Sequence, residues 1–203
     1  MKSTRKKAIL YIHGKGGSFM EAEKYKKNCV GFNIIGVDYN EYIPWIVQNQ
    51  IKTAYDNLKK EYECISIISN SIGAYFSMHT LQNCDIEKAL LISPILDMER
   101  LILDMMLWAN VTEKELSEKR EILTDFGETL SWKYLMFVRE NPIKWDVATE
   151  ILYAGKDNLT SRKTVDTFVE SHNAQLTIME DGEHWFHTDE QVTFLDQWMK
   201  KVI

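Results

Sequence analysis

Three polar residues of the chain have the types and the order that nucleophilic catalysis by a serine requires. Ser71 follows one apolar stretch, Asp157 follows a later one, and His184 follows another near the end of the chain. A serine hydroxyl is a poor nucleophile at neutral pH, so it needs a histidine within hydrogen-bond reach and a carboxylate that orients this histidine. The chain supplies these groups in the order Ser, Asp, His.

Residues 69–73, Ser-Asn-Ser-Ile-Gly, form the stretch that could hold such a nucleophile. They separate residues 64–68, which are apolar and β-branched like a buried strand, from a segment whose apolar residues recur with helical spacing. A sharp strand-to-helix turn needs small residues two positions before and after its apex, and Ser69 and Gly73 meet that need around Ser71. Ser69 departs from the usual G-x-S-x-G sequence. The stretch also fits a simple helix cap, since Asn and Ser are favoured there.

A glycine-rich turn at residues 13–18, His-Gly-Lys-Gly-Gly-Ser, follows the first apolar stretch. Such a loop could cradle a phosphate, but it lacks the full phosphate-loop and dinucleotide-binding signatures. Glycines also let a backbone N–H approach a substrate oxygen closely, as in an oxyanion hole. This second use needs a nucleophile elsewhere, which residues 69–73 supply.

The rest of the chain alternates strands and helices. We expect strands at residues 6–13, 33–38, 64–68, 88–93, 149–155 and 175–179, with helical segments at about 42–62, after Gly73, at 161–172 and from 189. This alternation predicts an α/β protein with a mostly parallel sheet covered on both faces. Because parallel strands end at one edge of a sheet, the loops that carry Ser71, Asp157 and His184 can converge there.

The alternation stops between about residues 98 and 146, where the sequence is rich in Met, Leu and Trp and has helical periods. Leu101, Met105, Trp108, Trp132 and Leu135 are among the residues that fall near one face, which is the pattern of a core-facing helix and equally of a lid. We predict a small helical cap over 98–146, inserted into a single domain of residues 1–203 after the strand that ends near Ser93.

Four segments together resemble the small serine hydrolases of the α/β-hydrolase fold. They are the strand with its His13-Gly14-Lys15-Gly16-Gly17 turn, residues 69–73, the Gly155-Lys156-Asp157 sequence, and Gly182-Glu183-His184. The resemblance covers nearly the whole chain, although the early antiparallel strands of larger relatives are missing. It implies a three-layer α/β/α sandwich.

The resemblance also implies a role for each site residue. Ser71 would be the nucleophile, His184 the general base and then acid, and Asp157 the carboxylate that orients the imidazole. The backbone N–H groups of Ile72 and Lys15 would form the oxyanion hole.

Some of these assignments have rivals in the sequence. Asp97 follows the strand that ends near Ser93, where some enzymes of this fold place the acid. His187 lies close to His184, and Ser69 could be proposed as the nucleophile, although it occupies a position that must be small. His13 is more simply a structural partner of its own turn.

Composition limits the partners of the protein. The net charge is −6 and the isoelectric point is near 5.4, which argues against nucleic acid. No stretch approaches the roughly 18 apolar residues of a membrane span, so we expect a cytoplasmic protein without a membrane partner. The three cysteines are scattered, which supports neither a disulfide framework nor a zinc site. We expect no metal or organic cofactor, and an exposed apolar cap would favour a homodimer.

We expect the substrate to be a carboxylic ester of modest size. The Met- and Trp-rich insertion, with Trp185 and Phe186 beside the expected base, suggests a pocket for an acyl or aromatic group. A thioesterase, a lactonase or an amidase would use the same three residues, and the sequence does not separate them. The alternatives from other classes are a non-catalytic, hydrolase-like binding module and a nucleotide-binding α/β protein.

Overall fold

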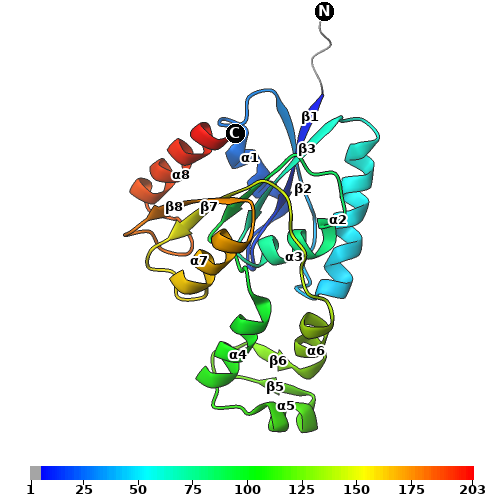
Figure 1. The fold of residues 1–203 in the computed structure, drawn as a ribbon, viewed down its shortest axis with the longest axis vertical. Coiled ribbons are helices and arrows are strands. Elements are labelled where there is room, and N and C mark those ends of the chain that lie inside the picture. Colours follow the sequence, from blue (N-terminus) through cyan, green and yellow to red (C-terminus); the bar gives the residue numbers. More distant parts are fainter. Residues whose placement is uncertain (1–5) are drawn as a thin grey trace, which may run out of the picture. The chain divides into compact units, whose positions relative to one another are not determined.

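A computed structural model describes residues 6–203 of the chain (Figure 1). The chain divides into two compact units. The first contains the described residues up to Leu96 together with Lys144–Ile203, and the second is Asp97–Ile143.

The first unit is built on a six-stranded parallel sheet with the strand order β2-β1-β3-β4-β7-β8. The strands are β1 (Lys7–Ile12), β2 (Phe32–Gly36), β3 (Cys64–Asn70), β4 (Lys88–Ile92), β7 (Thr149–Ala154) and β8 (Ala174–Met179). All six strands predicted from the sequence are present, with ends that differ by one or two residues. The central strand β3 is buried along almost its whole length, as expected for a parallel strand covered on both faces.

Helices cover the sheet. They are the single 3-10 turn η1 (Phe19–Glu21), α1 (Ala22–Tyr25), α2 (Pro44–Lys59), α3 (Ile72–Leu81), α7 (Arg162–Ser171) and α8 (Asp189–Val202). Right-handed crossovers place α2, α3 and α7 on one face and α1 on the other. The fold is therefore the expected α/β sandwich. The short segment η1–α1 was not predicted from the sequence.

One apolar cluster joins α1 and α8 to the sheet. Tyr25 of α1 and Trp198 and Met199 of α8 are buried in it with residues from β1, β3, β4, β7 and β8. Tyr11 of β1 belongs to the same cluster, and its hydroxyl lies within hydrogen-bond distance of Glu21 and of Asn70, the last residue of β3. This side of the sheet carries the pocket described below.

The second unit contains α4 (Met98–Trp108), α5 (Glu113–Lys119) and α6 (Trp132–Glu140), with an antiparallel hairpin of β5 (Glu121–Leu123) and β6 (Thr129–Ser131). Arg139 of α6 ties this unit together, since it binds Glu99 of α4 and Glu113 of α5. The sequence predicted helices throughout this segment, so the hairpin corrects that prediction.

The cysteines are all free thiols, and burial raises the pKa of Cys29 to about 11. Within residues 6–203, no group of three or more His, Cys, Asp or Glu side chains could hold a metal ion. Nor does any helix in that range have the length and apolar character needed to cross a membrane.

Candidate active site

The candidate site lies at the carboxyl edge of the sheet, beside the point where the strand order reverses. β1 pairs with β2 on one side and with β3 on the other, so the loops that leave β1 and β3 separate to opposite faces there. Such switch points are where open α/β sheets bind ligands. The glycine-rich loop follows β1, Ser71 follows β3, Asp157 follows β7 and His184 follows β8.

Ser71 occupies a strained turn between β3 and α3. Its φ of 51° and ψ of −122° lie in a region that L residues rarely adopt, at a cost on the order of 1–3 kcal/mol. The turn is fixed from both ends, since Ser71 N–H donates to Ile92 O at 3.0 Å and Ile95 N–H donates to Ser71 O at 3.0 Å. The segment after β4 therefore holds the backbone of the proposed nucleophile in place.

Small residues make room for this turn, as the sequence suggested. A Cβ at Gly73 would lie 2.5 Å from the carbonyl oxygens of Ile12 and His13, and one at Gly14 would lie 3.1 Å from Ser71 Cβ. Ser69, in place of the usual glycine, is fully buried, and its hydroxyl donates to Ser77 Oγ at 3.0 Å. The turn thus accepts serine at this position because α3 offers its side chain a partner.

We predict that Gly73→Ala lowers the free energy of unfolding by about 3 kcal/mol, because the added methyl group meets backbone that cannot rotate away. Urea unfolding followed by circular dichroism measures the loss. Gly31→Ala is the matched control. Gly31 has a φ of 89° and open space around it, so this change costs only the backbone strain, about 1 kcal/mol. Equal losses in the two variants would contradict the steric explanation.

The structure brings Ser71, His184 and Asp157 together. Ser71 Oγ lies 2.8 Å from His184 Nε2, and His184 Nδ1 lies 2.7 Å from Asp157 Oδ2. The side chain of His184 is 5% exposed and that of Asp157 is fully buried. With the Nδ1 proton directed at Asp157, Nε2 is left to accept the hydroxyl proton of Ser71.

The Asp157 carboxylate has further partners. Its Oδ1 accepts from the backbone N–H groups of Leu159 at 2.8 Å and Thr160 at 3.1 Å. Thr160 is itself fixed, since its hydroxyl donates to Pro94 O at 2.9 Å and its carbonyl accepts from Tyr153. The carboxylate is thus oriented by its own loop.

The other candidate residues from the sequence have hydrogen-bond or ion-pair partners outside the group of Ser71, His184 and Asp157. Asp97 caps α4, where its side chain accepts from Arg100 N–H at 2.9 Å. His187 is largely exposed and pairs with Glu183 at 3.4 Å. His13 is buried against its own turn, stacks on Tyr39, and places its ring nitrogens near the carbonyl oxygens of Gly14 and Tyr39.

The two proposed oxyanion donors flank Ser71. Ile72 begins α3, so its N–H has no acceptor within the helix. Lys15 lies in the loop after β1, which packs so closely on the turn that a Cβ added at Gly14 would lie 3.1 Å from Ser71 Cβ. The loop is held by a bond from Gly17 N–H to Gly14 O at 3.1 Å and by one from Gly16 N–H to Tyr42 Oη at 3.0 Å.

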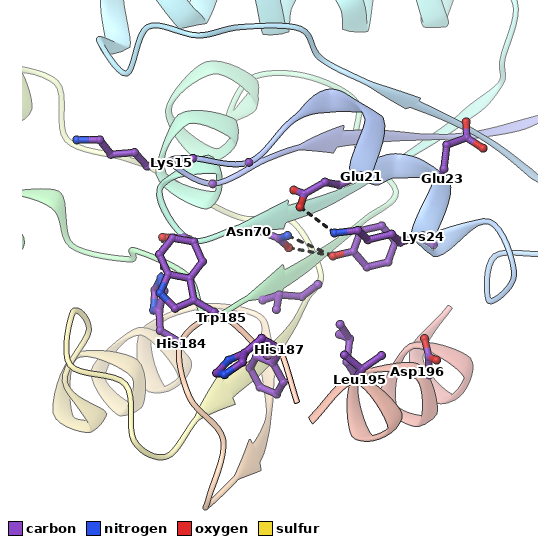
Figure 2. A pocket seen from close by; sticks show the side chains of 18 of the residues that line it. Lys15, Glu21, Glu23, Lys24, Asn70, His184, Trp185, His187, Leu195 and Asp196 are labelled. Carbon is purple, nitrogen blue, oxygen red and sulfur yellow. Dashed lines mark hydrogen bonds and ion pairs between the residues drawn. The ribbon is translucent and has the colours of Figure 1, made fainter. Parts of the chain in front are cut away.

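A pocket of about 750 Å³ opens from Ser71 and His184. One part of its wall is apolar and comprises Ile92, Trp185, Phe186, Val192 and Leu195. Another part is polar and comes from η1 and α1 together with Asn70, the residue before Ser71. Figure 2 shows Glu21, Lys24 and Asn70 gathered there, with His187 and Leu195 across the pocket from them. The sequence predicted only the apolar character.

A hydrogen-bond network organises the polar wall. Asn70 Nδ2 donates to the hydroxyls of Tyr11 at 3.0 Å and Tyr25 at 3.2 Å. Tyr11 donates to Glu21 Oε2 at 2.9 Å, and Lys24 pairs with Glu21 Oε1 at 2.9 Å. Burial acts to raise the pKa of Glu21, but the bonds from Lys24 and Tyr11 outweigh it and lower the pKa below its ordinary value. Burial raises the pKa of both tyrosines, which keeps their hydroxyls protonated.

No protein-family model matches the chain, and no curated protein matches it significantly in sequence. Solved structures do resemble it. Est1E from Butyrivibrio proteoclasticus is 15% identical, with a TM-score of 0.78 over 98% of this chain and 88% of that one. Mouse alpha/beta hydrolase domain-containing protein 10 is 14% identical, with a TM-score of 0.74 over 96% and 88%. A lipase-esterase related protein from Clostridium acetobutylicum is 16% identical, with a TM-score of 0.63 over 98% and 95%.

The strand order, the crossovers and these likenesses define one class of protein. The chain has the α/β-hydrolase fold. At the carboxyl edge of its sheet it carries a hydrogen-bonded Ser71, His184 and Asp157.

Proposed function

We propose that this protein is a serine hydrolase that cleaves a small carboxylic ester through an acyl-enzyme. The observation that carries the proposal is the chain of two short hydrogen bonds from Ser71 through His184 to the buried Asp157. Ser71 sits at the apex of a strained turn at the mouth of a pocket, which is where a nucleophile has access to a substrate. Strain of this kind concentrates at functional sites.

In the first step, Ser71 Oγ bonds to the ester carbonyl carbon while His184 Nε2 takes the hydroxyl proton. The carbonyl oxygen becomes negative and accepts from the N–H groups of Ile72 and Lys15. The bond to the alcohol oxygen then breaks, and His184 returns its proton to the leaving alcohol. In the second step, water gives a proton to His184 and its oxygen attacks the acyl carbon. The bond from this carbon to Ser71 Oγ then breaks and His184 returns the proton to Oγ, which releases the carboxylic acid and restores Ser71. Asp157 stabilises the imidazolium formed in each step.

An ester is proposed because the pocket beside His184 has an apolar part that can cover an acyl or aromatic group. Trp185 and Phe186 follow the proposed base directly and line this pocket, as the sequence suggested. Thioesters, lactones and amides would pass through the same steps. The alternative of a non-catalytic binding module was supported only by the serine at position 69, where the usual sequence has glycine. The hydrogen bond from Ser69 to Ser77 explains how the turn can form with serine at this position.

A fluorophosphonate probe tests the proposal. We expect one covalent adduct in the intact mass, and peptide mapping should place it on Ser71, because an activated serine attacks the phosphorus. His184→Ala should abolish the adduct by removing the base. His187→Ala is the matched control from the same loop and should retain it, since His187 pairs with Glu183 instead.

Two results would contradict the proposed function. One is the absence of an adduct under conditions that label a known serine hydrolase. The other is an equal labelling rate in His184→Ala, which would mean that the histidine does not activate the serine.

A further inference from the structure

The side chains of the pocket's polar wall take no part in the proposed chemical steps. The name polar wall is used for Glu21, Lys24, Tyr25 and Asn70, and this wall is continuous with the site because Asn70 directly precedes Ser71. The other charged residues of the pocket lining are Lys15, Glu23, Lys27 and Asp196, so positive and negative groups are equal in number around it. A substrate that extends from Ser71 and fills this volume of about 750 Å³ contacts the groups of the polar wall as well as the apolar part of the lining. What they can bind therefore bears on the identity of the substrate.

A hydrocarbon chain would be poorly accommodated along this wall. Covering a carboxylate, an ammonium and a phenol removes them from water, and a hydrocarbon offers no hydrogen bond in return. A hydroxyl group can replace the lost water, since it both donates and accepts. Glu21 is anchored for this purpose by Tyr11 and Lys24, so its carboxylate is held in one place as an acceptor.

The charges of the wall favour a neutral group. Glu21 and Lys24 form an ion pair at 2.9 Å, and Tyr25 and Asn70 are uncharged. A charged substrate group of either sign would have to compete with one member of this pair for the other, and it would face a like charge in doing so. An uncharged group that carries hydroxyls meets neither penalty.

We propose that this polar wall is a substrate subsite for a neutral, hydroxylated group, so that the substrate is an ester with free hydroxyls away from the scissile bond. Glu21 accepts from one substrate hydroxyl, and the hydroxyl of Tyr25, placed by Asn70, forms the second contact. The apolar wall with Trp185, Val192 and Leu195 covers the carbon skeleton of the same molecule. The inference rests on the proposed esterase function and names its substrate class.

Matched esters test the subsite from both sides of the scissile bond. Glycerol monobutyrate, which carries hydroxyls on its alcohol part, is compared with propyl butyrate. The ω-hydroxy derivative of ethyl caproate, which carries a hydroxyl on its acyl part, is compared with ethyl caproate itself. We expect kcat/KM to be about tenfold or more higher for the hydroxylated member of at least one pair, the effect of one hydrogen bond to a charged acceptor.

Substitutions in the polar wall then test whether it causes the preference for the hydroxylated ester. Glu21→Gln and Tyr25→Phe should each bring the ratio within the responsive pair to about one third of its value or less, because each removes one contact to the hydroxyl. Glu87→Gln and Tyr62→Phe are the matched controls. Both residues precede their strands at the opposite edge of the sheet and should leave the ratio unchanged. If the wall had only a structural role, these substitutions would lower kcat/KM for both esters of a pair equally and leave their ratio unchanged.

The outcomes separate the subsite from the function on which it rests. Hydrolysis of both pairs at equal rates would overturn the subsite and leave the hydrolase intact. So would a hydroxyl preference that persists in Glu21→Gln and Tyr25→Phe. If no ester is hydrolysed and Ser71 is not labelled by the fluorophosphonate, the proposed function itself has failed and the subsite fails with it.

Discussion

Ser71→Ala is expected to lower kcat for an ester substrate by about a millionfold, to the residual rate given by binding and the oxyanion donors. The substitution removes only Oγ, so the acyl-enzyme cannot form. Alanine adopts the same backbone as serine, and the bonds of residue 71 to Ile92 and Ile95 involve backbone atoms alone. The fold should therefore persist while the activity is lost.

The measurement is steady-state hydrolysis of an activated ester, with urea unfolding of both proteins to show that they fold alike. Ser69→Ala is the matched control, because Ser69 lies two residues away in the same turn but donates to Ser77. It should remain within about tenfold of the parent rate, since one buried hydrogen bond contributes about 1 kcal/mol. Activity that survives in Ser71→Ala and disappears in Ser69→Ala would mean that Ser69, and not Ser71, is the nucleophile.

The second large effect is expected for Asp157→Asn, with a loss in kcat of about ten-thousandfold. An amide at this position keeps the size of the side chain but loses its charge. It can also turn its NH2 toward Nδ1, which favours the tautomer with the proton on Nε2. His184 then faces Ser71 with a donor where it needs an acceptor, although the two side chains remain 2.8 Å apart.

Asp97→Asn serves as the control for this prediction, because the sequence alone leaves Asp97 open as the acid. Its carboxylate caps α4 by accepting from Arg100 N–H, so its loss should cost at most about 1 kcal/mol of stability and little activity. Both variants are compared in the same ester assay. A strong loss in Asp97→Asn together with an active Asp157→Asn would refute the assignment of Asp157.

Local sequence rules were sufficient for the sheet and for the three side chains at its edge. The strands are short apolar runs, and the turn at Ser71 needs small neighbours that can be recognised in the sequence. The order of the loops then follows from the rule that parallel strands end together. The sequence favours Asp157 as the acid and leaves Asp97 as an alternative, because both follow strands of the same sheet. In the structure the contact to His184 is made by Asp157.

The polar wall could not be predicted for a physical reason. Glu21, Lys24 and Tyr25 lie far from Asn70 in the chain, and the helix α1 that carries Lys24 and Tyr25 has only four residues. A segment this short has no stable helical preference of its own and forms through packing on the sheet. The β5–β6 hairpin was missed for a similar reason, since its strands have three residues each, which is too short for an alternating pattern to be recognised in the sequence.

The segment after β4 has a consequence for how the protein can be redesigned. Ile92 and Ile95 bind the backbone of Ser71, and Pro94 binds Thr160 in the loop of Asp157, so three of the four residues 92–95 support two of the three side chains at the site. The second unit begins at Asp97, just beyond this support, and ends at Ile143, before β7. A chimaera that exchanges residues 97–143 for another segment therefore has natural junctions that leave the support whole, and the insertion can be treated as a replaceable module.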